Sequence, residues 1–369
     1  MLLCFGGAVL AVALLAHRAS SLFGTSSPDL VGPIYAVAFC PDATHIATAN
    51  QDGTVRLWDV HDGHEVRRFG KQHPAVVSVA VSSTGKQVVA TWNDWMRREY
   101  GWIVWDLENG HQMQRAIGHE KTVNDVIFTL DDRQILTASS DRTLRLWDAE
   151  SGVELFRFHG HEGDVNSVSI SPDGRQALSG AGDYWGGVLH DPTVRLWDLD
   201  SKQLLRSFAG HEGQVTDAAF SPDEEHVASC SWDGTVRIWD LRTGKEVDRL
   251  ECPPTDAHLN CLAYSPDGHF IVAGSGFADR GSLHFWNASS GSDVPRFAGR
   301  FSVVHSVAFA PGGTTIVSAH GYHGVRPDGA TDFFGMPLAT ALDGVVRVWD
   351  AEGGKELTQV GAEKASPSR

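Results

Sequence analysis

Residues 122–158 read TVNDVIFTLDDRQILTASSDRTLRLWDAESGVELFRF, and they contain four short runs that favour β-strands. The runs TVNDVIF, QILTA, TLRLWD and VELFRF are rich in β-branched and large apolar residues. Consecutive runs are separated by LDDR, SSD or ESG, in which Asp, Ser or Gly favours a tight bend. The stretch therefore predicts one antiparallel sheet of four strands.

The same pattern recurs along the whole chain. Its most regular mark is a Trp that follows a β-branched or Leu-rich run and precedes Asp or Asn, at intervals of 42 to 63 residues. One supersecondary unit of roughly 40–45 residues plus insertions explains this period. Both a first turn such as SPDG and a last turn such as ESG are kept in every unit. The seven tryptophans are Trp58, Trp105, Trp147, Trp197, Trp239, Trp286 and Trp349.

A small four-stranded sheet cannot bury both of its faces alone, so the units must stack radially around an axis. We therefore predict an all-β fold, a seven-bladed β-propeller of four-stranded antiparallel blades, over residues 31–361. A short hydrophobic N-terminal helix is expected to precede it. The other predicted segments are a signal or membrane anchor at 1–19, a linker at 20–30 and a disordered tail at 362–369.

The N-terminal run at residues 2–16, LLCFGGAVLAVALLA, contains no charged residue. Its length suits the core of a signal peptide better than a membrane span of about 20 residues, but no basic residues precede it. A cleaved signal, a short membrane anchor and a buried or mis-started segment all stay open. The chain is expected to be exported or anchored to a membrane, with a cytoplasmic location as the alternative.

The amino-acid composition limits the classes of partner and cofactor that we expect for this chain. The 46 acidic residues outnumber the 30 basic ones, and no basic patch stands out, so we expect no nucleic-acid partner. The five cysteines lack the spacing of a zinc site, and no cofactor or metal is predicted. One pair, Cys252 and Cys261, could form a disulfide if the domain lies outside the cytoplasm.

The repeats resemble those of the WD-repeat family. Three Gly-His pairs, at 118–119, 160–161 and 210–211, each precede a turn containing Asp and then a Trp-Asp pair. The resemblance implies a buried hydrogen-bond chain from a turn Asp to His, to a Ser or Thr, to the Trp indole. Three units match it: Asp141, His119, Thr137 and Trp147; Asp191, His161, Ser179 and Trp197; and Asp233, His211, Ser229 and Trp239.

The His, Asp and Ser sets also invite comparison with a hydrolase triad. A triad nucleophile occurs once and is exposed beside an oxyanion hole, whereas these sets repeat by unit and aim the hydroxyl at a Trp. No GxSxG motif is present either. We therefore predict that the chain is not an enzyme and that these residues are structural.

Four units depart from the family pattern, and their blades are expected to be less rigid. The first has Pro33 in place of Gly-His, and the second keeps only His73. The sixth has His258 but Ala273 at the hydroxyl position, and the seventh has Arg300 in place of His. Closure of the ring stays open: either residues 355–362 or residues 21–24 supply the outer strand of the last blade.

Insertions between the second and third strands distinguish the units. The second, fourth, sixth and seventh units carry 5, 8, 3 and 21 additional residues there. In the family these loops share one end of the ring with the connections between blades. Because exposed aromatic residues near Arg make strong interfaces, we predict that the insertions bind a partner. The predicted residues are Trp92, Trp95, Arg97, Tyr100, Trp102, Tyr184, Trp185, Phe277, Tyr322, Phe333 and Phe334.

The seventh insertion is only a weak candidate for a metal site. His320 and His323 lie near Asp328 and Asp332, but their spacing on a Gly-rich loop is loose for a metal site.

The favoured function is a non-catalytic, monomeric scaffold that binds protein partners. One alternative is the sensor module of a membrane signalling system, since such propellers resemble those appended to bacterial kinases. Another is a carbohydrate or small-ligand site in which Trp92, Trp95 and Trp185 stack on sugar rings.

Overall fold

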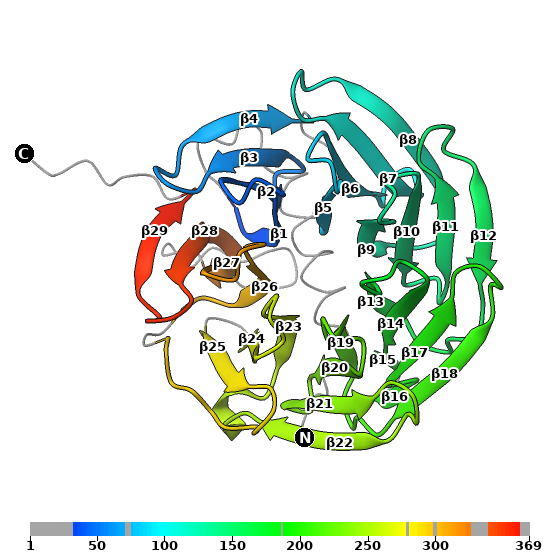
Figure 1. Ribbon diagram of the computed structural model, residues 1–369. Helices are drawn as coiled ribbons and strands as arrows, with labels where there is room; N and C mark the ends of the chain where they lie inside the picture. Colours follow the sequence, from blue (N-terminus) through cyan, green and yellow to red (C-terminus); the bar gives the residue numbers. More distant parts are fainter. Residues whose placement is uncertain are drawn as a thin grey trace, which may run out of the picture.

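The computed structural model is a ring of seven antiparallel β-sheets around a central axis (Figure 1). Within the described residues, six sheets have four strands, and the sixth sheet along the chain has three. The all-β, seven-bladed propeller predicted from the repeats is confirmed. The described residues are 32–70, 75–185, 187–277, 280–297, 301–325 and 339–361.

Each blade runs from an inner strand at the axis to an outer strand at the rim (Figure 1). Blade 1 consists of β1 (Ile34–Phe39), β2 (His45–Asn50), β3 (Val55–Asp59) and β4 (Glu65–Phe69). Blade 2 consists of β5 (Val79–Val81), β6 (Gln87–Asp94), β7 (Glu99–Asp106) and β8 (Gln112–His119). Blade 3 consists of β9 (Val123–Phe128), β10 (Gln134–Ser139), β11 (Leu144–Asp148) and β12 (Glu154–Phe158).

The remaining blades follow the same order, with a two-stranded hairpin inserted in blade 4. Blade 4 consists of β13 (Val165–Ile170), β14 (Gln176–Ala181), β17 (Thr193–Asp198) and β18 (Leu204–Ala209), with β15 (Asp183–Trp185) and β16 (Val188–His190) as the inserted hairpin. Blade 5 consists of β19 (Val215–Phe220), β20 (His226–Ser231), β21 (Thr235–Asp240) and β22 (Glu246–Glu251). Blade 6 consists of β23 (Leu259–Tyr264), β24 (Phe270–Phe277) and β25 (Arg280–Asn287), preceded by a 3-10 turn, η1 (Pro254–Asp256). Blade 7 consists of β26 (Val304–Phe309), β27 (Thr315–Val325), β28 (Ala339–Asp350) and β29 (Glu356–Val360).

Burial explains the residue pattern of each blade. The second strand β10 is buried over almost its whole length because neighbouring blades cover both of its faces. The outer strand β4 alternates between half-buried and exposed residues and ends on the buried Phe69, because one of its faces meets water. Continuous apolar runs therefore mark inner strands, and alternating runs mark the rim.

Aromatic contacts join neighbouring blades. The ring of Phe158, on the outer strand of blade 3, lies 5.4 Å from the ring of Trp197 in blade 4. Phe208 of blade 4 contacts Trp239 of blade 5 in the same way, with ring centroids 5.8 Å apart. The repeated Trp thus fills the space between two blades, and burial of these rings stabilises the stack.

The C-terminal strand completes the last blade. β29 pairs with β28, and blade 1 holds its own four strands, so no β-strand pairing between the described ends of the chain clasps the ring. Blades 1 and 7 instead share an apolar cluster that includes Ile34, Trp58 and Val346. The backbone N–H of Val37 also donates to the Ser306 hydroxyl at 3.3 Å. Of the two predicted closures, the structure has the one through residues 355–362.

Blade 6 departs from the predicted four strands. Isolated bridges pair Asp293 with Trp286 and Phe301 with Gly281, but no continuous strand covers β25 in the described residues. Pro295 lies between these bridges, and proline has no N–H to donate to a ladder. Its position explains why the outer strand is interrupted.

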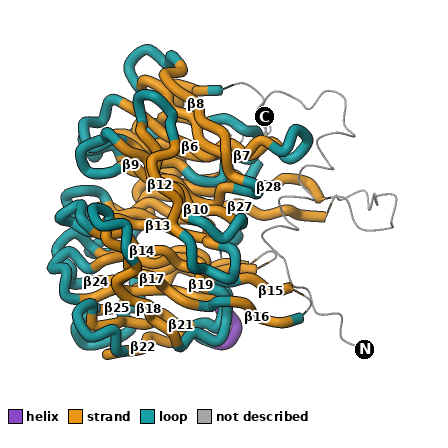
Figure 2. Tube along the Cα trace, turned by 90° about the vertical axis from the view of Figure 1, so that its right-hand side faces the viewer, coloured by secondary structure: helices purple, strands orange, loops and turns teal. Residues whose placement is uncertain are grey.

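The insertions lie at one end of the ring. The hairpin β15–β16 and the ends of β27 and β28 protrude on the right-hand side of Figure 2. This end, called the insertion face below, carries the connections between the second and third strands and those between blades. The opposite end, called the turn face, carries the short turns that join first to second and third to fourth strands.

Several predicted segments lie outside the described residues. These are the helix and anchor at 1–19, the linker at 20–30, the competing strand at 21–24 and the tail at 362–369. In the part of the chain that the structure describes, no helix is both long and apolar enough to span a membrane. Cys252 and Cys261 are both free thiols, so the disulfide considered for them is not formed.

Candidate interaction face

The three predicted hydrogen-bond chains are formed in the structure. In blade 3, His119 Nδ1 lies 2.7 Å from Asp141 and His119 Nε2 lies 2.7 Å from the Thr137 hydroxyl. The indole N–H of Trp147 donates to the same hydroxyl at 2.9 Å. A histidine protonated on Nδ1 satisfies all three contacts. Blades 4 and 5 have the same bonds, at 2.6–2.9 Å, through His161, Asp191, Ser179 and Trp197 and through His211, Asp233, Ser229 and Trp239.

The electrostatics of these chains suit a structural role. Burial lowers the pKa of His119, which favours the neutral ring that the hydrogen bonds require. Burial by itself raises the pKa of Asp141, but hydrogen bonds from His119, Thr143 and the Glu120 N–H bring it well below its usual range. The Thr137 hydroxyl is buried and already accepts the indole N–H. It is therefore held as a structural link rather than as a nucleophile.

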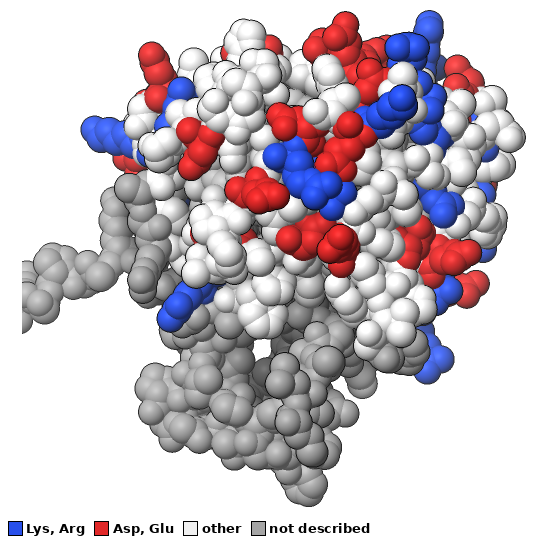
Figure 3. All heavy atoms as spheres, turned by 90° about the horizontal axis from the view of Figure 1, so that it is seen from below, with Lys and Arg blue, Asp and Glu red and all other residues white. Residues whose placement is uncertain are grey.

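A buried arginine extends two of these chains to the rim. Arg145 donates to Asp141 and to Glu154, both at 2.8 Å, and Glu154 in turn pairs with Arg157 on the outer strand. Blade 5 repeats the pattern through Arg237, Glu246 and Arg249. Acidic and basic side chains accordingly alternate on the rim seen from the side of β22 (Figure 3). An Arg stands two residues before five of the seven tryptophans, and this was a signal for the network that the sequence reasoning missed.

Blades 1 and 7 replace the missing histidine from within their own second strands. In blade 7 the Ser318 hydroxyl accepts the Trp349 indole N–H at 2.8 Å and lies 2.6 Å from His320 Nε2. In blade 1 Thr48 accepts from Trp58 at 2.9 Å and from the amide of Asn50 at 3.1 Å. Lower rigidity of these two blades stays a prediction, although the hydroxyl partner whose loss motivated it is replaced. Each indole has its hydroxyl, and each hydroxyl has a second partner.

His320 is therefore a structural residue. It is only 1% exposed, and burial lowers its pKa to about 3. Its Nε2 atom contacts Ser318, which leaves that nitrogen no room for a metal. The side chain of His323, and Asp328 and Asp332 altogether, lie outside the described residues.

Three of the aromatic residues predicted to bind a partner are buried. Trp92, Tyr100 and Trp102 are 3%, 8% and 0% exposed. Trp102 packs against Trp147 of blade 3, with ring centroids 6.3 Å apart. Trp92 lies under the guanidinium of Arg115 at 4.2 Å. The long hairpin β6–β7 folds these rings into the contact between blades, so the prediction that they form an exposed surface is wrong. The sugar-stacking alternative loses Trp92 for the same reason.

The other predicted residues divide into two groups. Arg97 and Phe277 are exposed on the insertion face, and Trp95 and Tyr184 are half-buried there. Trp95 donates its indole N–H to the Thr122 hydroxyl at 3.1 Å. The side chains of Trp185 and Tyr322, and the whole of Phe333 and Phe334, lie outside the described residues.

An aromatic column across blades 5 and 6 was missed by the sequence reasoning. Trp232 meets His258 edge to face with ring centroids 5.2 Å apart, and His258 stacks on Phe277 at 4.9 Å. Phe277, at the outer end of the column, is 51% exposed. Burial, and then the charge of the Asp233 carboxylate, raise the pKa of Tyr184 in blade 4. These residues come from separate repeats and show no shared pattern in the sequence.

The insertion face of blade 4 also carries two carboxyl groups, Asp164 and Asp183. Burial first, and then the neighbouring Asp183, raise the pKa of Asp164 to about 6, while Lys121 opposes the shift. Above that pH, Asp164 adds negative charge to this part of the face.

The central channel is polar where blades meet. It contains a cavity of about 430 Å³ lined by inner strands. Asp125 accepts the Ser78 hydroxyl at 2.6 Å and the backbone N–H of Val168 in the next blade at 2.9 Å. Asp217 accepts the N–H of Leu262 in blade 6 at 3.0 Å. Both carboxyl groups therefore join neighbouring blades.

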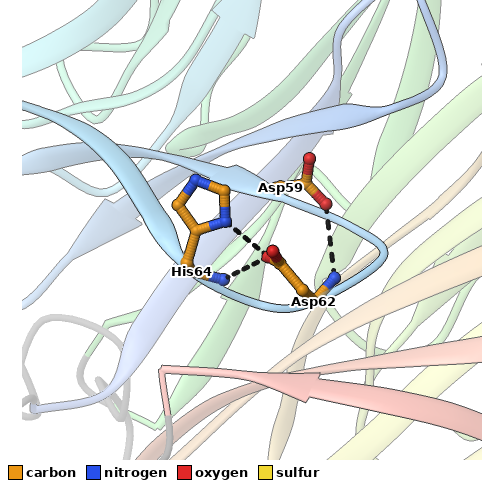
Figure 4. Close-up of side chains that lie close together, drawn as sticks. All are labelled: Asp59, Asp62 and His64. Carbon is orange, nitrogen blue, oxygen red and sulfur yellow. Dashed lines mark hydrogen bonds and ion pairs between the residues drawn. The ribbon is translucent and has the colours of Figure 1, made fainter.

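Asp59, Asp62 and His64 form a small acidic group on the turn face (Figure 4). The Asp62 carboxylate accepts the backbone N–H of His64 at 3.0 Å and contacts His64 Nδ1. The Asp62 N–H points to Asp59, which also accepts the N–H of His61. These bonds are those of a tight turn and account for the arrangement.

Comparison with known protein families shows which family these repeats resemble. The family model described as "WD domain, G-beta repeat" matches residues 24–59, 110–148, 152–198, 202–240 and 244–287, more than half of the chain. Blade 7, and the strands of blade 2 other than β8, lie outside these matches.

Relatives share the repeats over part of their length. Protein tipD of Dictyostelium discoideum is 30% identical over 265 residues, which cover 71% of this chain and 40% of that protein. Nuclear distribution protein PAC1 of Coccidioides posadasii is 30% identical over 138 residues, covering 37% and 28%. A guanine nucleotide-binding protein subunit beta of Solanum tuberosum is 32% identical over 123 residues, covering 31% of each chain.

The match thus spans less than half of each relative's length. All three relatives are eukaryotic, so they lend no support to the resemblance to bacterial kinase-linked propellers. The seven-bladed ring, the buried Asp–His–hydroxyl–Trp chains and the matched family model agree, and the chain belongs to the WD-repeat family of β-propellers.

Proposed function

We propose that this chain is a non-catalytic scaffold that binds a protein partner through its insertion face. The observation that carries the proposal is the exposed aromatic end of the column formed by Trp232, His258 and Phe277, which lies on the same insertion face as the inserted hairpin β15–β16. Exposed aromatic side chains on a rigid frame bury large apolar areas at small cost in conformational entropy. The family also supports binding of a protein partner, since one relative is named as a subunit of a guanine nucleotide-binding protein.

The rest of the molecule favours a rigid frame. In blades 3 to 5 the histidine, aspartate and hydroxyl sets hold the Trp of their blade through hydrogen bonds. The carboxyl groups of the channel form hydrogen bonds that join neighbouring blades. A frame of this kind holds its loops in constant relative positions, which lowers the entropic cost of binding. Export or membrane attachment through residues 2–16 remains a separate proposal, testable by fractionation of the full chain.

Site-specific photo-crosslinking tests whether the partner binds the insertion face. A photoreactive amino acid is placed at Phe277 or Met96 on the insertion face, and at Leu130 on the turn face as a matched control, since all three are at least half exposed. We expect the same protein to be captured from Phe277 and Met96 and not from Leu130. Capture of that protein with equal yield from Leu130 contradicts the proposal.

A further inference from the structure

We propose that the insertion face of blades 3 to 5, together with the exposed Phe277 of blade 6, binds a segment of a protein partner. This segment is basic and contains arginine or lysine. The inference rests on the proposed function and names the chemistry of the partner. Three glutamates, Glu120, Glu162 and Glu212, supply the charge, and the aromatic column ending at Phe277 supplies the apolar contact.

The three glutamates hold equivalent positions, one in each blade. Each follows the histidine of its Gly-His pair. The backbone N–H groups of Glu120, Glu162 and Glu212 donate to the turn aspartates Asp141, Asp191 and Asp233 at 3.1, 2.8 and 3.0 Å. The aspartate that contacts the histidine of each buried chain therefore also fixes the backbone of the glutamate. The result is an acidic arc that repeats with the spacing of the blades.

The carboxylates of the arc are available to a partner. All three glutamates are exposed, and their side chains form no hydrogen bond or ion pair with any residue that the structure describes. Asp256, which holds the corresponding position in blade 6, differs because it lies 3.5 Å from His284. The arc thus ends at blade 5, where the aromatic column begins.

The acidic arc and the aromatic column are connected through two consecutive residues, Trp232 and Asp233. Trp232 directly precedes Asp233, the residue that accepts the Glu212 N–H. The Trp232 N–H donates to the carbonyl of Gln214, two residues beyond Glu212, at 3.1 Å. Carboxylates and aromatic faces therefore adjoin on one surface. A guanidinium group matches both, because it pairs with carboxylates and stacks on aromatic rings.

The charge of the chain favours a cationic partner over other occupants. The net charge is −16, which repels a second copy of the chain and acidic segments. Asp164 and Asp183 add carboxyl groups to the insertion face of blade 4, and Lys121, the residue after Glu120, offsets part of their charge. A basic segment is the occupant whose charge is complementary to the face.

The test measures binding of a defined peptide to the full chain by fluorescence anisotropy. The probe is a labelled dodecapeptide with six arginines alternating with alanines, and its control has glutamates in place of the arginines. The test variant is the triple substitution Glu120→Gln, Glu162→Gln and Glu212→Gln. The control variant, Glu108→Gln, Glu150→Gln and Glu225→Gln, removes the same charge from exposed positions on the turn face.

We expect the arginine peptide to bind and the glutamate peptide not to bind. The triple substitution in the arc should raise the Kd at least about tenfold, and the control triple should change it less than about twofold. Phe277→Ala should raise the Kd about two- to fivefold, whereas Leu130→Ala on the turn face should leave it unchanged. Equal weakening by both triples shows that only the net charge attracts the peptide, and overturns the inference.

Two further outcomes also count against it. Loss of self-association in light scattering, caused by the arc variant alone, makes the surface a contact between copies of this chain. Absence of any binding of the arginine peptide removes the basic segment as the partner. Crosslinking from Phe277 and Met96 can still succeed in that case, so failure of this inference is distinguishable from failure of the proposed function.

Discussion

His320 Nε2 lies 2.6 Å from the hydroxyl of Ser318, two residues earlier on the same strand, and that hydroxyl holds the indole of Trp349. In blades 4 and 5 the equivalent histidine comes from the connection between blades, and in blade 3 it is the last residue of β8 in the preceding blade. Blade 7 therefore keeps the buried contact to its Trp while its connection to blade 6 carries no histidine.

His320→Ala should destabilise the ring about as much as His211→Ala in blade 5. Each substitution removes the second partner of a buried hydroxyl and opens a cavity, so each should lower the free energy of unfolding by about 1–3 kcal/mol. Urea denaturation followed by tryptophan fluorescence measures both. The exposed His269→Ala is the control. If His320→Ala behaves like His269→Ala, the structural role of His320 is disproved.

Arg145→Ala should be more damaging than Arg195→Ala. Arg145 pairs with Asp141 and Glu154 at 2.8 Å, whereas blade 4 has Leu204 on its outer strand and Arg195 approaches only Asp191, at 3.6 Å. Removing one member of a buried network leaves its partners unpaired, at a cost of about 3–5 kcal/mol for Arg145. Chemical denaturation of the two variants checks the order. Equal losses contradict the extended network.

Stability should depend on pH through Asp217. Burial raises its pKa to about 7, although the Leu262 N–H opposes the shift, and Asp125 adds to it. The folded chain therefore binds a proton at this site more tightly than the unfolded chain, whose carboxyl titrates near 3.8. The stability that this proton confers is complete below about pH 4 and is lost as pH rises towards 7.

The matched variant is Asp217→Asn, which keeps the shape and cannot ionise. Its stability relative to the native chain should rise by about 1–3 kcal/mol between pH 4.5 and pH 7.5. Urea titrations of both proteins at several pH values give this difference directly, because other titrating groups cancel. A difference that stays flat with pH rules out the shifted carboxyl.

Trp92→Ala and Phe277→Ala should differ in stability, because the first ring is packed in the interior and the second is exposed. Trp92 is 3% exposed, so its removal should cost about 3–5 kcal/mol of stability. Phe277 is 51% exposed, so its removal should change stability by less than about 0.5 kcal/mol. Thermal and chemical denaturation distinguish the two. A stable Trp92→Ala protein contradicts the buried position of this ring.

The sequence alone determined the number of blades, the order of their strands and the three complete hydrogen-bond chains. The number of blades and the order of their strands follow from local periodicity, because strands, turns and a Trp recur within each unit of about 40–45 residues. The three chains are what the resemblance to the WD-repeat family implies, and in each of them the indole contacts the expected hydroxyl, as Trp147 contacts Thr137.

Tertiary structure alone decided which side chains face water and which residues meet across blades. Trp102 and Phe277 both lie in insertions, yet the first is buried and the second is exposed, because burial depends on what a neighbouring repeat places opposite. The column of Trp232, His258 and Phe277 draws on two blades, and His320 replaces a histidine missing from another loop. Such contacts depend on packing between distant segments, which local patterns do not encode.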